Sequence, residues 1–284
     1  TLFVEEDEKT GAETEVVASV ISASISAILH IHAENNDGEY FIKQVINEKT
    51  DDVLSRARIL KIPDEAIRVV FVIRASSKHS EEALQVIKNL AVGSKDFLFE
   101  NKTGEIVFVR TCKTEPSAAK LKGIAREISE VMATDAFEAA SIGIGMTVTN
   151  LSALSSSYKS AVNALDIGEI FVNKNRIYAY NNLGISRLIS SVPIGKCKAF
   201  LNEVLNDKIL SEIDNETLYT IQKFLDYDLN ISLAARELYI HRNTLVYRLD
   251  RLQKQTGLDV RKFEDAMLFK IAILIHKYLG ATRR

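Results

Sequence analysis

Residues 230–252 read Asn-Ile-Ser-Leu-Ala-Ala-Arg-Glu-Leu-Tyr-Ile-His-Arg-Asn-Thr-Leu-Val-Tyr-Arg-Leu-Asp-Arg-Leu, and they decide the fold of the C-terminal part of the chain. Two short helical patterns meet there across a turn of about three residues, the spacing of a helix-turn-helix. Ser232 is expected to cap the first helix, because its hydroxyl can accept from a backbone N–H one turn on. The second helix has one narrow apolar side, formed at i, i+4 and i+7 by Leu245, Leu249 and Leu252.

The side of the second helix opposite Leu245 carries an unusual set of side chains. A step of 100° per residue places Asn243, Tyr247, Asp250 and Lys254 there. Thr244 and Arg251 flank this side, and His241 and Arg242 lie at the exposed N-terminal end. An ordinary solvated face has mixed Glu and Lys, whereas Arg, Asn, Thr and Tyr are prominent here. Arg can bind guanine and Asn can bind adenine in the major groove, and Thr and Tyr suit phosphate contacts, which position a protein without specifying sequence. The alternative is an ordinary pair of packed helices with a basic face. We predict DNA binding, through His241, Arg242, Asn243, Thr244, Tyr247 and Arg251.

Two residues of this segment leave alternatives open. His241 stands at the first turn of the second helix, where it can either contact a base or cap the helix. Arg248 lies off the exposed face. It can reach a phosphate or form a structural ion pair with Glu237 or Asp250, and we favour the ion pair.

The C-terminal segment resembles the helix-turn-helix domain of the PucR/CdaR family of bacterial transcription regulators. The resemblance is close over residues 240–249 and continues through Thr256-Gly257-Leu258-Asp259 and the apolar stretch from Phe263 to Leu279. A generic helix-turn-helix often has Gly in its turn, where this chain has Tyr239. The family typically has a bulky residue there. A left-handed conformation at Tyr239 would cost on the order of 1–2 kcal/mol.

Composition places the chain among ordinary globular proteins. With 284 residues, 46% hydrophobic and 26% charged, it is long enough for two domains. The formal net charge of -2 argues against a general polyanion binder. Basic charge is instead local, because the segment from Arg236 to Lys254 has five Lys/Arg and two Asp/Glu. Two distant cysteines, Cys112 and Cys197, fit a reducing cytoplasm rather than a disulfide framework.

The N-terminal part predicts a signalling helix. The chain starts at Thr1 rather than Met and shows no signal peptide, so we expect a fragment or a processed product. Residues 16–33 carry no formal charge, and a membrane span is one interpretation. Four Ser and two His interrupt the segment. Its apolar side repeats with the heptad spacing of paired helices, so we favour a dimerising helix, with the seam at Val17, Ile21, Ser24, Ile28 and Ile31.

The middle of the chain changes from helical to strand periodicity at Ile67. Strand patterns at 68–73, 97–99, 105–109, 140–145 and 176–180 alternate with helical patterns at 80–91, 117–132 and 151–165. The order is βαββαβ with an added αβ, which is the ferredoxin-like plan. Residues 67–181 resemble the GGDEF-like middle domain of the same family, including the stretch from Ser157 to Leu165.

This resemblance raises an enzyme hypothesis, cyclic-dinucleotide synthesis with Mg²⁺ held by carboxylates. The sequence argues against it, because a cyclase has an Asp near the end of the first strand where this chain has Arg74, and because its metal-binding turn is here Asn101-Lys102-Thr103-Gly104-Glu105. Gly143 and Gly145 suggest close backbone packing rather than dinucleotide binding, since the third Gly of that motif is missing. We therefore expect no catalytic residue, no cofactor and no metal site.

The sequence thus predicts an α+β protein with a degenerate, ferredoxin-like GGDEF-like domain, an all-α helix-turn-helix domain and an N-terminal signalling helix. The expected segments are residues 1–37 (the end of a sensor domain and the dimerising helix), 38–182 (helical lead-in and GGDEF-like domain), 183–214 (helical connector) and 215–284 (DNA-binding domain). The expected function is sequence-specific transcription regulation on promoter DNA, as a cytoplasmic homodimer or higher oligomer with an unknown small-molecule effector sensed upstream and no membrane association. The alternative is a non-catalytic nucleotide-binding signalling protein.

Overall fold

The computed structural model consists of two compact units. One comprises Thr1–Leu165 and Arg176–Asn181, and the other Asp166–Asn175 and Asn182–Arg284. The structure describes residues 17–24, 38–50, 52–75, 84–85, 87–89, 93, 95–101, 103–135, 140–171, 176–205, 209 and 212–282.

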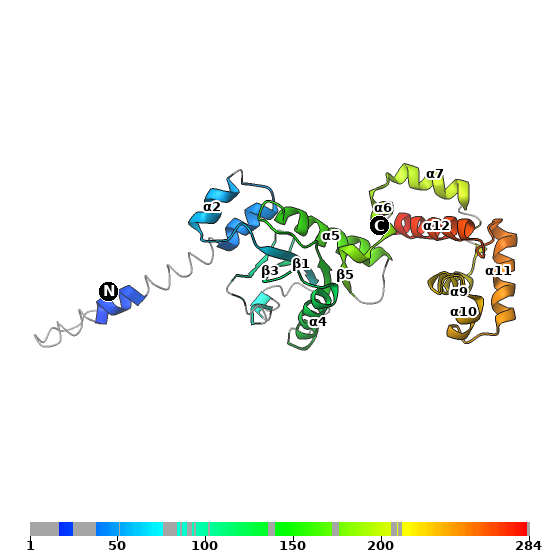
Figure 1. Cartoon of the computed structure of the whole chain (residues 1–284), viewed down its shortest axis with the longest axis horizontal. Helices are drawn as coiled ribbons and strands as arrows, with labels where there is room; N and C mark the ends of the chain where they lie inside the picture. Colours follow the sequence, from blue (N-terminus) through cyan, green and yellow to red (C-terminus); the bar gives the residue numbers. More distant parts are fainter. Residues whose placement is uncertain are drawn as a thin grey trace, which may run out of the picture. The chain divides into compact units, whose positions relative to one another are not determined.

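A five-stranded sheet organises the first unit (Figure 1). Its strands are β1 (Ile67–Ala75), β2 (Phe97–Glu100), β3 (Ile106–Cys112), β4 (Ala140–Ile144) and β5 (Ile177–Ala179), in the spatial order β2-β3-β1-β4-β5. β1 to β4 pair antiparallel, whereas β5 is parallel to β4. The first four strands therefore have the predicted ferredoxin-like topology, and β5 extends the sheet at one edge.

Both faces of β1 are buried, because helices cover the sheet on each side. Val69, Phe71 and Ile73 form a core with residues of α4 (Ala118–Asp135). Val70 lies on the opposite face, toward α5 (Leu154–Phe171), whose Ser157 hydroxyl accepts from the Val70 amide at 3.0 Å. Helical residues 38–46 and α2 (Val53–Ile59) precede the sheet.

The helix α5 approaches β4 more closely than side chains normally allow. A Cβ added to Gly143 would lie 2.1 Å from the Ala161 carbonyl oxygen, and one added to Gly145 would lie 2.1 Å from that of Ser157. The Ser157 hydroxyl also donates to the Met146 carbonyl at 2.6 Å. The interpretation of these glycines as a close packing site is therefore confirmed.

The element boundaries agree with the sequence patterns within a few residues, with one larger difference. The last helix of the unit continues to Phe171 rather than ending at Leu165. Helix 80–91 lies mostly outside the described residues, although 84–85 and 87–89 are helical. In the N-terminal segment, residues 17–24 are helical and expose Val17 and Ile21. Ile28 and Ile31 lie outside the described residues.

The second unit is entirely helical in its described part (Figure 1). Its core gathers apolar side chains such as Phe224, Leu245, Leu249 and Phe269. The long apolar helix at its C-terminal end packs against three of the others, so the two helices expected to form a connector belong to the same compact unit as the helix-turn-helix. The helices are α6 (Ile185–Ser191), α7 (Ile194–Val204), α9 (Asn215–Asp226), α10 (Ile231–Glu237), α11 (Arg242–Thr256) and α12 (Phe263–Ala281).

Among the helices that the structure describes, none combines the length and the apolar character needed to cross a membrane.

Candidate DNA-binding surface

The first helix of the motif, α10, begins two residues earlier than a cap at Ser232 would place it. Asn230 has an extended backbone, and its side-chain oxygen accepts from the Leu233 amide at 3.0 Å. Asn is as good an N-cap as Ser, so the helix starts at Ile231 and Ser232 becomes an exposed position in its first turn. The predicted cap at Ser232 was therefore wrong by two residues.

The turn after α10 is closed by two backbone hydrogen bonds. The Tyr239 amide donates to the Arg236 carbonyl at 3.1 Å, and the Ile240 amide donates to the Ala235 carbonyl at 3.0 Å. This arrangement requires a left-handed residue after the helix, and Tyr239 has φ 55°. The conformation costs a non-Gly residue on the order of 1–2 kcal/mol, as anticipated from the sequence, and the Tyr239 side chain is 97% exposed.

His241 is the N-cap of α11. Its Nδ1 accepts from the Asn243 amide at 3.3 Å, and its backbone is extended. The sequence left open whether His241 caps the helix or contacts a base. In the free protein, His241 is the cap. The imidazole remains exposed at the beginning of the helix.

α11 is divided into a buried side and an exposed side as the leucine spacing predicts. Leu245, Leu249 and Leu252 are buried in the helical core. Tyr247 is 68% exposed on the other side. All six residues predicted to bind DNA are exposed on α11 or at its N-cap, and we refer to them as the recognition surface: His241, Arg242, Asn243, Thr244, Tyr247 and Arg251.

Arg248 has a structural role, but its partners are not those expected. It donates to the Thr220 hydroxyl at 2.6 Å and to the Glu216 carboxylate at 2.5 Å, both on α9. Glu237 instead accepts from the Tyr227 hydroxyl at 3.2 Å. Arg248 therefore fixes α11 against α9, since a guanidinium can serve two acceptors at once.

Acidic groups beside the recognition surface are paired with arginines. Asp214, the N-cap of α9, lies 3.6 Å from Arg251, and Asp250 lies 2.8 Å from Arg261. Backbone and side-chain hydrogen bonds from Thr217, with the charge of Arg251, lower the pKa of Asp214. These pairings offset carboxylate charge that would repel phosphates, although Arg251 shares its own charge with Asp214.

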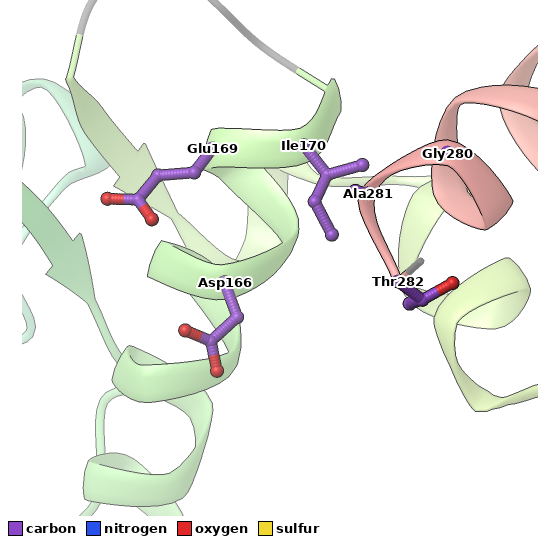
Figure 2. A pocket seen from close by; sticks show the side chains of 6 residues that line it. All are labelled: Asp166, Glu169, Ile170, Gly280, Ala281 and Thr282. Atoms are coloured by element: carbon purple, nitrogen blue, oxygen red, sulfur yellow. The ribbon is translucent and has the colours of Figure 1, made fainter. Parts of the chain in front are cut away.

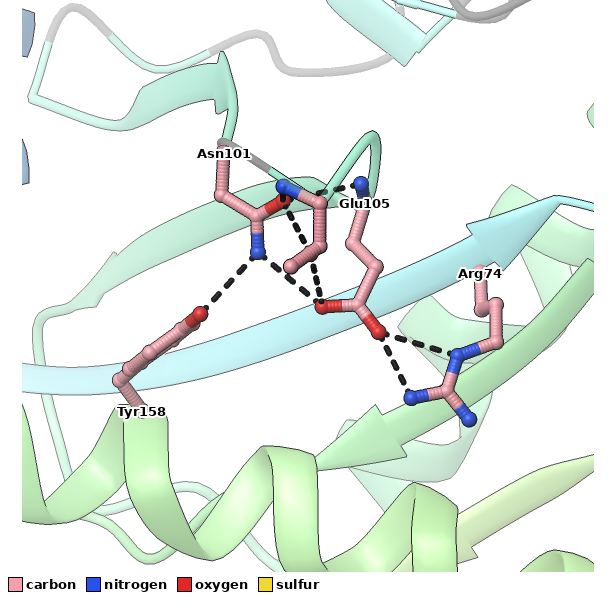
Figure 3. A network of polar contacts seen from close by, with 5 residues as sticks. Arg74, Asn101, Glu105 and Tyr158 are labelled. Carbon is pink, nitrogen blue, oxygen red and sulfur yellow. Dashed lines mark hydrogen bonds and ion pairs between the residues drawn. The ribbon is translucent and has the colours of Figure 1, made fainter. Parts of the chain in front are cut away.

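The second place of interest is the hairpin between β2 and β3, where the sequence lacks the metal-binding residues of a cyclase (Figure 3). Glu105 accepts from Arg74 Nε at 3.0 Å and Nη2 at 2.7 Å, and from Asn101 and Thr103 at 3.0 Å each. Asn101 Nδ2 also lies 3.0 Å from the Tyr158 hydroxyl of α5. The Arg74 charge thus neutralises the carboxylate of this hairpin within the protein.

A cavity of about 580 Å³ lies within the second unit, which includes the last turns of α5 from Asp166 onward, and it is lined by residues from the ends of α5 and α12 (Figure 2). Its lining includes Asp166 and Glu169, both of which have interaction partners, together with Gly280 and Thr282. None of the residues predicted from sequence to form a site lines it. Within the described part of the chain, no group of three or more His, Cys, Asp or Glu is arranged to hold a metal ion.

Comparison with protein families matches both units. Residues 47–167 match the family described as the GGDEF-like domain, and residues 217–275 match the PucR C-terminal helix-turn-helix domain. The first match contains β1 to β4 with the hairpin, and the second contains α10 and α11 with the recognition surface.

Relatives of known name align with part or most of the chain. The purine catabolism regulatory protein of Bacillus subtilis is 25% identical over 49% of this chain and 27% of its own length. The carbohydrate diacid regulator of Escherichia coli is 30% identical over 46% of this chain and 34% of its own length. The DNA-binding transcriptional activator AdeR of B. subtilis is 23% identical over 80% of this chain and 56% of its own length. The chain thus spans no more than about a third of the first two relatives.

Fold and sequence together define the class of protein: a GGDEF-like domain is followed in the chain by a helix-turn-helix domain of the PucR type. Within that class, the chain is similar to the PucR/CdaR-type regulators, with which it shares both types of domain.

Proposed function

We propose that this chain is a sequence-specific, DNA-binding transcription regulator that acts in the cytoplasm as a dimer or higher oligomer. The observation that carries the proposal is the recognition surface, in which six polar side chains are exposed on α11 and at its N-cap while three leucines fix the helix to the core. Such a helix fits the major groove, where Arg and Asn can discriminate bases.

Regulation by a small organic molecule is part of the proposal. The names of two relatives refer to purine catabolism and to carbohydrate diacids. We propose that an upstream sensor binds such an effector and that the GGDEF-like domain passes the signal on without catalysing a reaction. The Arg74–Glu105 ion pair supports a non-catalytic role, because the carboxylate of Glu105 beside the hairpin turn is already bound to an arginine of the same protein.

The recognition surface is tested by selecting bound fragments from genomic DNA and then measuring affinity for a panel of single-base operator variants. Arg242 is the first residue of α11. We expect Arg242→Ala to lose about 1–3 kcal/mol of binding and to relax preference at one base position. Thr244→Ala should weaken binding to all sequences about equally, because phosphate contacts carry no sequence information.

Lys270→Ala is the matched control, since it removes one positive charge from an exposed position of α12 in the same unit. It should leave base preference unchanged. Identical profiles for Arg242→Ala and Thr244→Ala would contradict the assigned roles. Uniform, steeply salt-sensitive binding that Arg242→Ala retains would contradict sequence-specific recognition, since it would reflect only phosphate electrostatics.

The nucleotide-binding alternative predicts saturable binding of labelled nucleotides that is insensitive to changes in α11. Titration of the wild-type chain and of Arg74→Ala, which opens the hairpin network, separates the two functions. We expect no saturable binding by either protein, and saturation at micromolar nucleotide would favour the alternative.

A further inference from the structure

Tyr239 is an aromatic residue at a turn position where the fold requires a left-handed backbone but no side chain. It occupies a left-handed backbone position, with φ 55°, where Gly would be free of steric strain. Its side chain is 97% exposed, so no contact within the unit compensates for the strain. The two backbone hydrogen bonds that close the turn would be the same with Gly at this position. An aromatic side chain here is therefore not explained by stability.

The position of Tyr239 in the chain brings it close to the groove that α11 would enter. Arg242, the first residue of α11, follows three residues later, so their Cα atoms are at most about 11 Å apart. The major groove is about 12 Å wide, which places a phosphate wall about 6 Å from a side chain at its centre. Because Tyr239 precedes the helix, it would lie toward the wall rather than the base edges when the N-terminus of α11 enters the groove. The two hydrogen bonds of the closed turn fix the backbone of Tyr239 relative to α10.

We propose that Tyr239 is a DNA-positioning residue whose hydroxyl donates to a phosphate oxygen beside the groove that α11 enters. The inference rests on the proposed function and extends the recognition surface by one residue. A phenol is suited to this contact, because it is a neutral donor on a rigid ring and adds no charge. Phosphate contacts of this kind set the register of the helix on the duplex.

The test uses the 284-residue chain, operator fragments obtained by selection, and the variants Tyr239→Gly and Tyr239→Phe. Tyr239→Gly should melt at or above the wild-type temperature, because it relieves the left-handed strain, and yet bind all operator variants about tenfold more weakly. Tyr239→Phe should show most of the same loss, since it lacks only the hydroxyl. The slope of log affinity against log salt should stay unchanged for both, because a neutral contact releases no counterion.

Asp228→Gly is the matched control. Asp228 is exposed with φ 52° in the turn before α10, so Gly relieves the same kind of strain there. Its affinity for DNA should equal or exceed that of the wild type, because the change removes a negative charge. If Asp228→Gly also lost affinity, the weaker binding of Tyr239→Gly would be due to a more flexible turn, and the proposed phosphate contact of Tyr239 would be overturned.

The remaining outcomes separate the inference from the proposed function. Wild-type affinity in Tyr239→Gly would overturn the positioning role, and wild-type affinity in Tyr239→Phe would overturn the hydroxyl contact, while both would leave the proposed function in place. A wild-type chain that selects no discrete DNA sites would overturn the proposed function, and the inference with it.

Discussion

Glu105 is a carboxylate that the protein holds ionised in a nearly buried place. Its side chain is 12% exposed and accepts hydrogen bonds from Arg74, Asn101 and Thr103. Burial by itself would raise its pKa, but the hydrogen bonds and the charge of Arg74 outweigh burial, so the pKa is lowered below the ordinary 4.5. A carboxyl group with a lowered folded-state pKa stabilises the fold above its unfolded-state pKa, and that contribution is lost as pH falls through the folded-state value.

We therefore expect Glu105→Gln to lower the free energy of unfolding by about 1–3 kcal/mol at pH 7. The difference from wild type should shrink as the pH falls below about 4.5, because the carboxyl group of the unfolded chain then becomes protonated, and it should vanish once the pH passes the lowered folded-state pKa. Urea denaturation between pH 3 and pH 7 measures it. Glu130→Gln, at an exposed position of α4, should change stability little at any pH. A difference for Glu105→Gln that is independent of pH would contradict this account.

The exposed side of α11 could be predicted from the sequence, whereas the hydrogen-bond partners of residues such as Arg248 could not. The leucine spacing fixes the buried side of a helix, and the opposite side follows from geometry. Arg248 contacts Glu216, which lies 32 residues earlier in the chain on another helix, so no local pattern reveals the pair. The sequence offered Glu237 and Asp250 because they are near in sequence. Asn230 was missed as a cap for a different reason, since two good capping residues stand two positions apart.

At the scale of elements, the contact between α5 and β4 depends on two glycines. Because a Cβ on Gly143 would lie 2.1 Å from the Ala161 carbonyl oxygen, the helix would have to move outward. We expect Gly143→Ala to destabilise the first unit by about 1–3 kcal/mol or more. Chemical denaturation followed by circular dichroism is the measurement.

Gly123 provides the control for this substitution. It lies inside α4, and a Cβ added to it would have nothing within 4 Å. Gly123→Ala should stabilise the same unit by about 0.5–1 kcal/mol, because Ala restricts the unfolded chain and favours helix. Equal effects of the two alanines would show that the close approach of α5 to β4 is not required.

The strands and their order were accessible from the sequence, but the means by which α5 is attached was not. Runs of β-branched and aromatic residues bounded by turns mark the strands, and the βαββαβ order selects the sheet topology. The Ser157 hydroxyl, however, bonds the Val70 amide across 87 residues of sequence. A serine in a helix has no local signature for such a bond. The extension of α5 to Phe171 was missed because Gly168 lies in the pattern, and Gly usually weakens a helix.

At the scale of the whole molecule, a single α11 would contact only a short DNA sequence, and a dimer would contact two such sequences. Helical residues 17–24 expose Val17 and Ile21, at 55% and 52%, on the side predicted to pair. We expect Ile21→Asn to shift the chain toward monomer in sedimentation and to weaken operator binding more than tenfold. Ser19→Asn, on the opposite side of the same helix, should change neither. Unchanged sedimentation of Ile21→Asn would contradict pairing through this helix.

The assignment of α6 and α7 to a connector could not be decided from the sequence. α6 and α7 have the composition of a connector, yet both pack against α12. A helix that is apolar on all sides, as α12 nearly is, needs several partners, and the sequence does not say which helices they are. The predicted boundaries at 37, 182 and 214 remain predictions.

The cap at His241 has a consequence for the chemistry that the recognition surface can offer. Because Nδ1 accepts the Asn243 amide, the neutral ring must carry its proton on Nε2. The helix terminus thus selects one tautomer and sets the polarity of the outward edge of the ring. His241 would present a donor to the groove, complementary to guanine O6 and N7, to thymine O4 or to a phosphate oxygen, and mismatched to the amino group of cytosine.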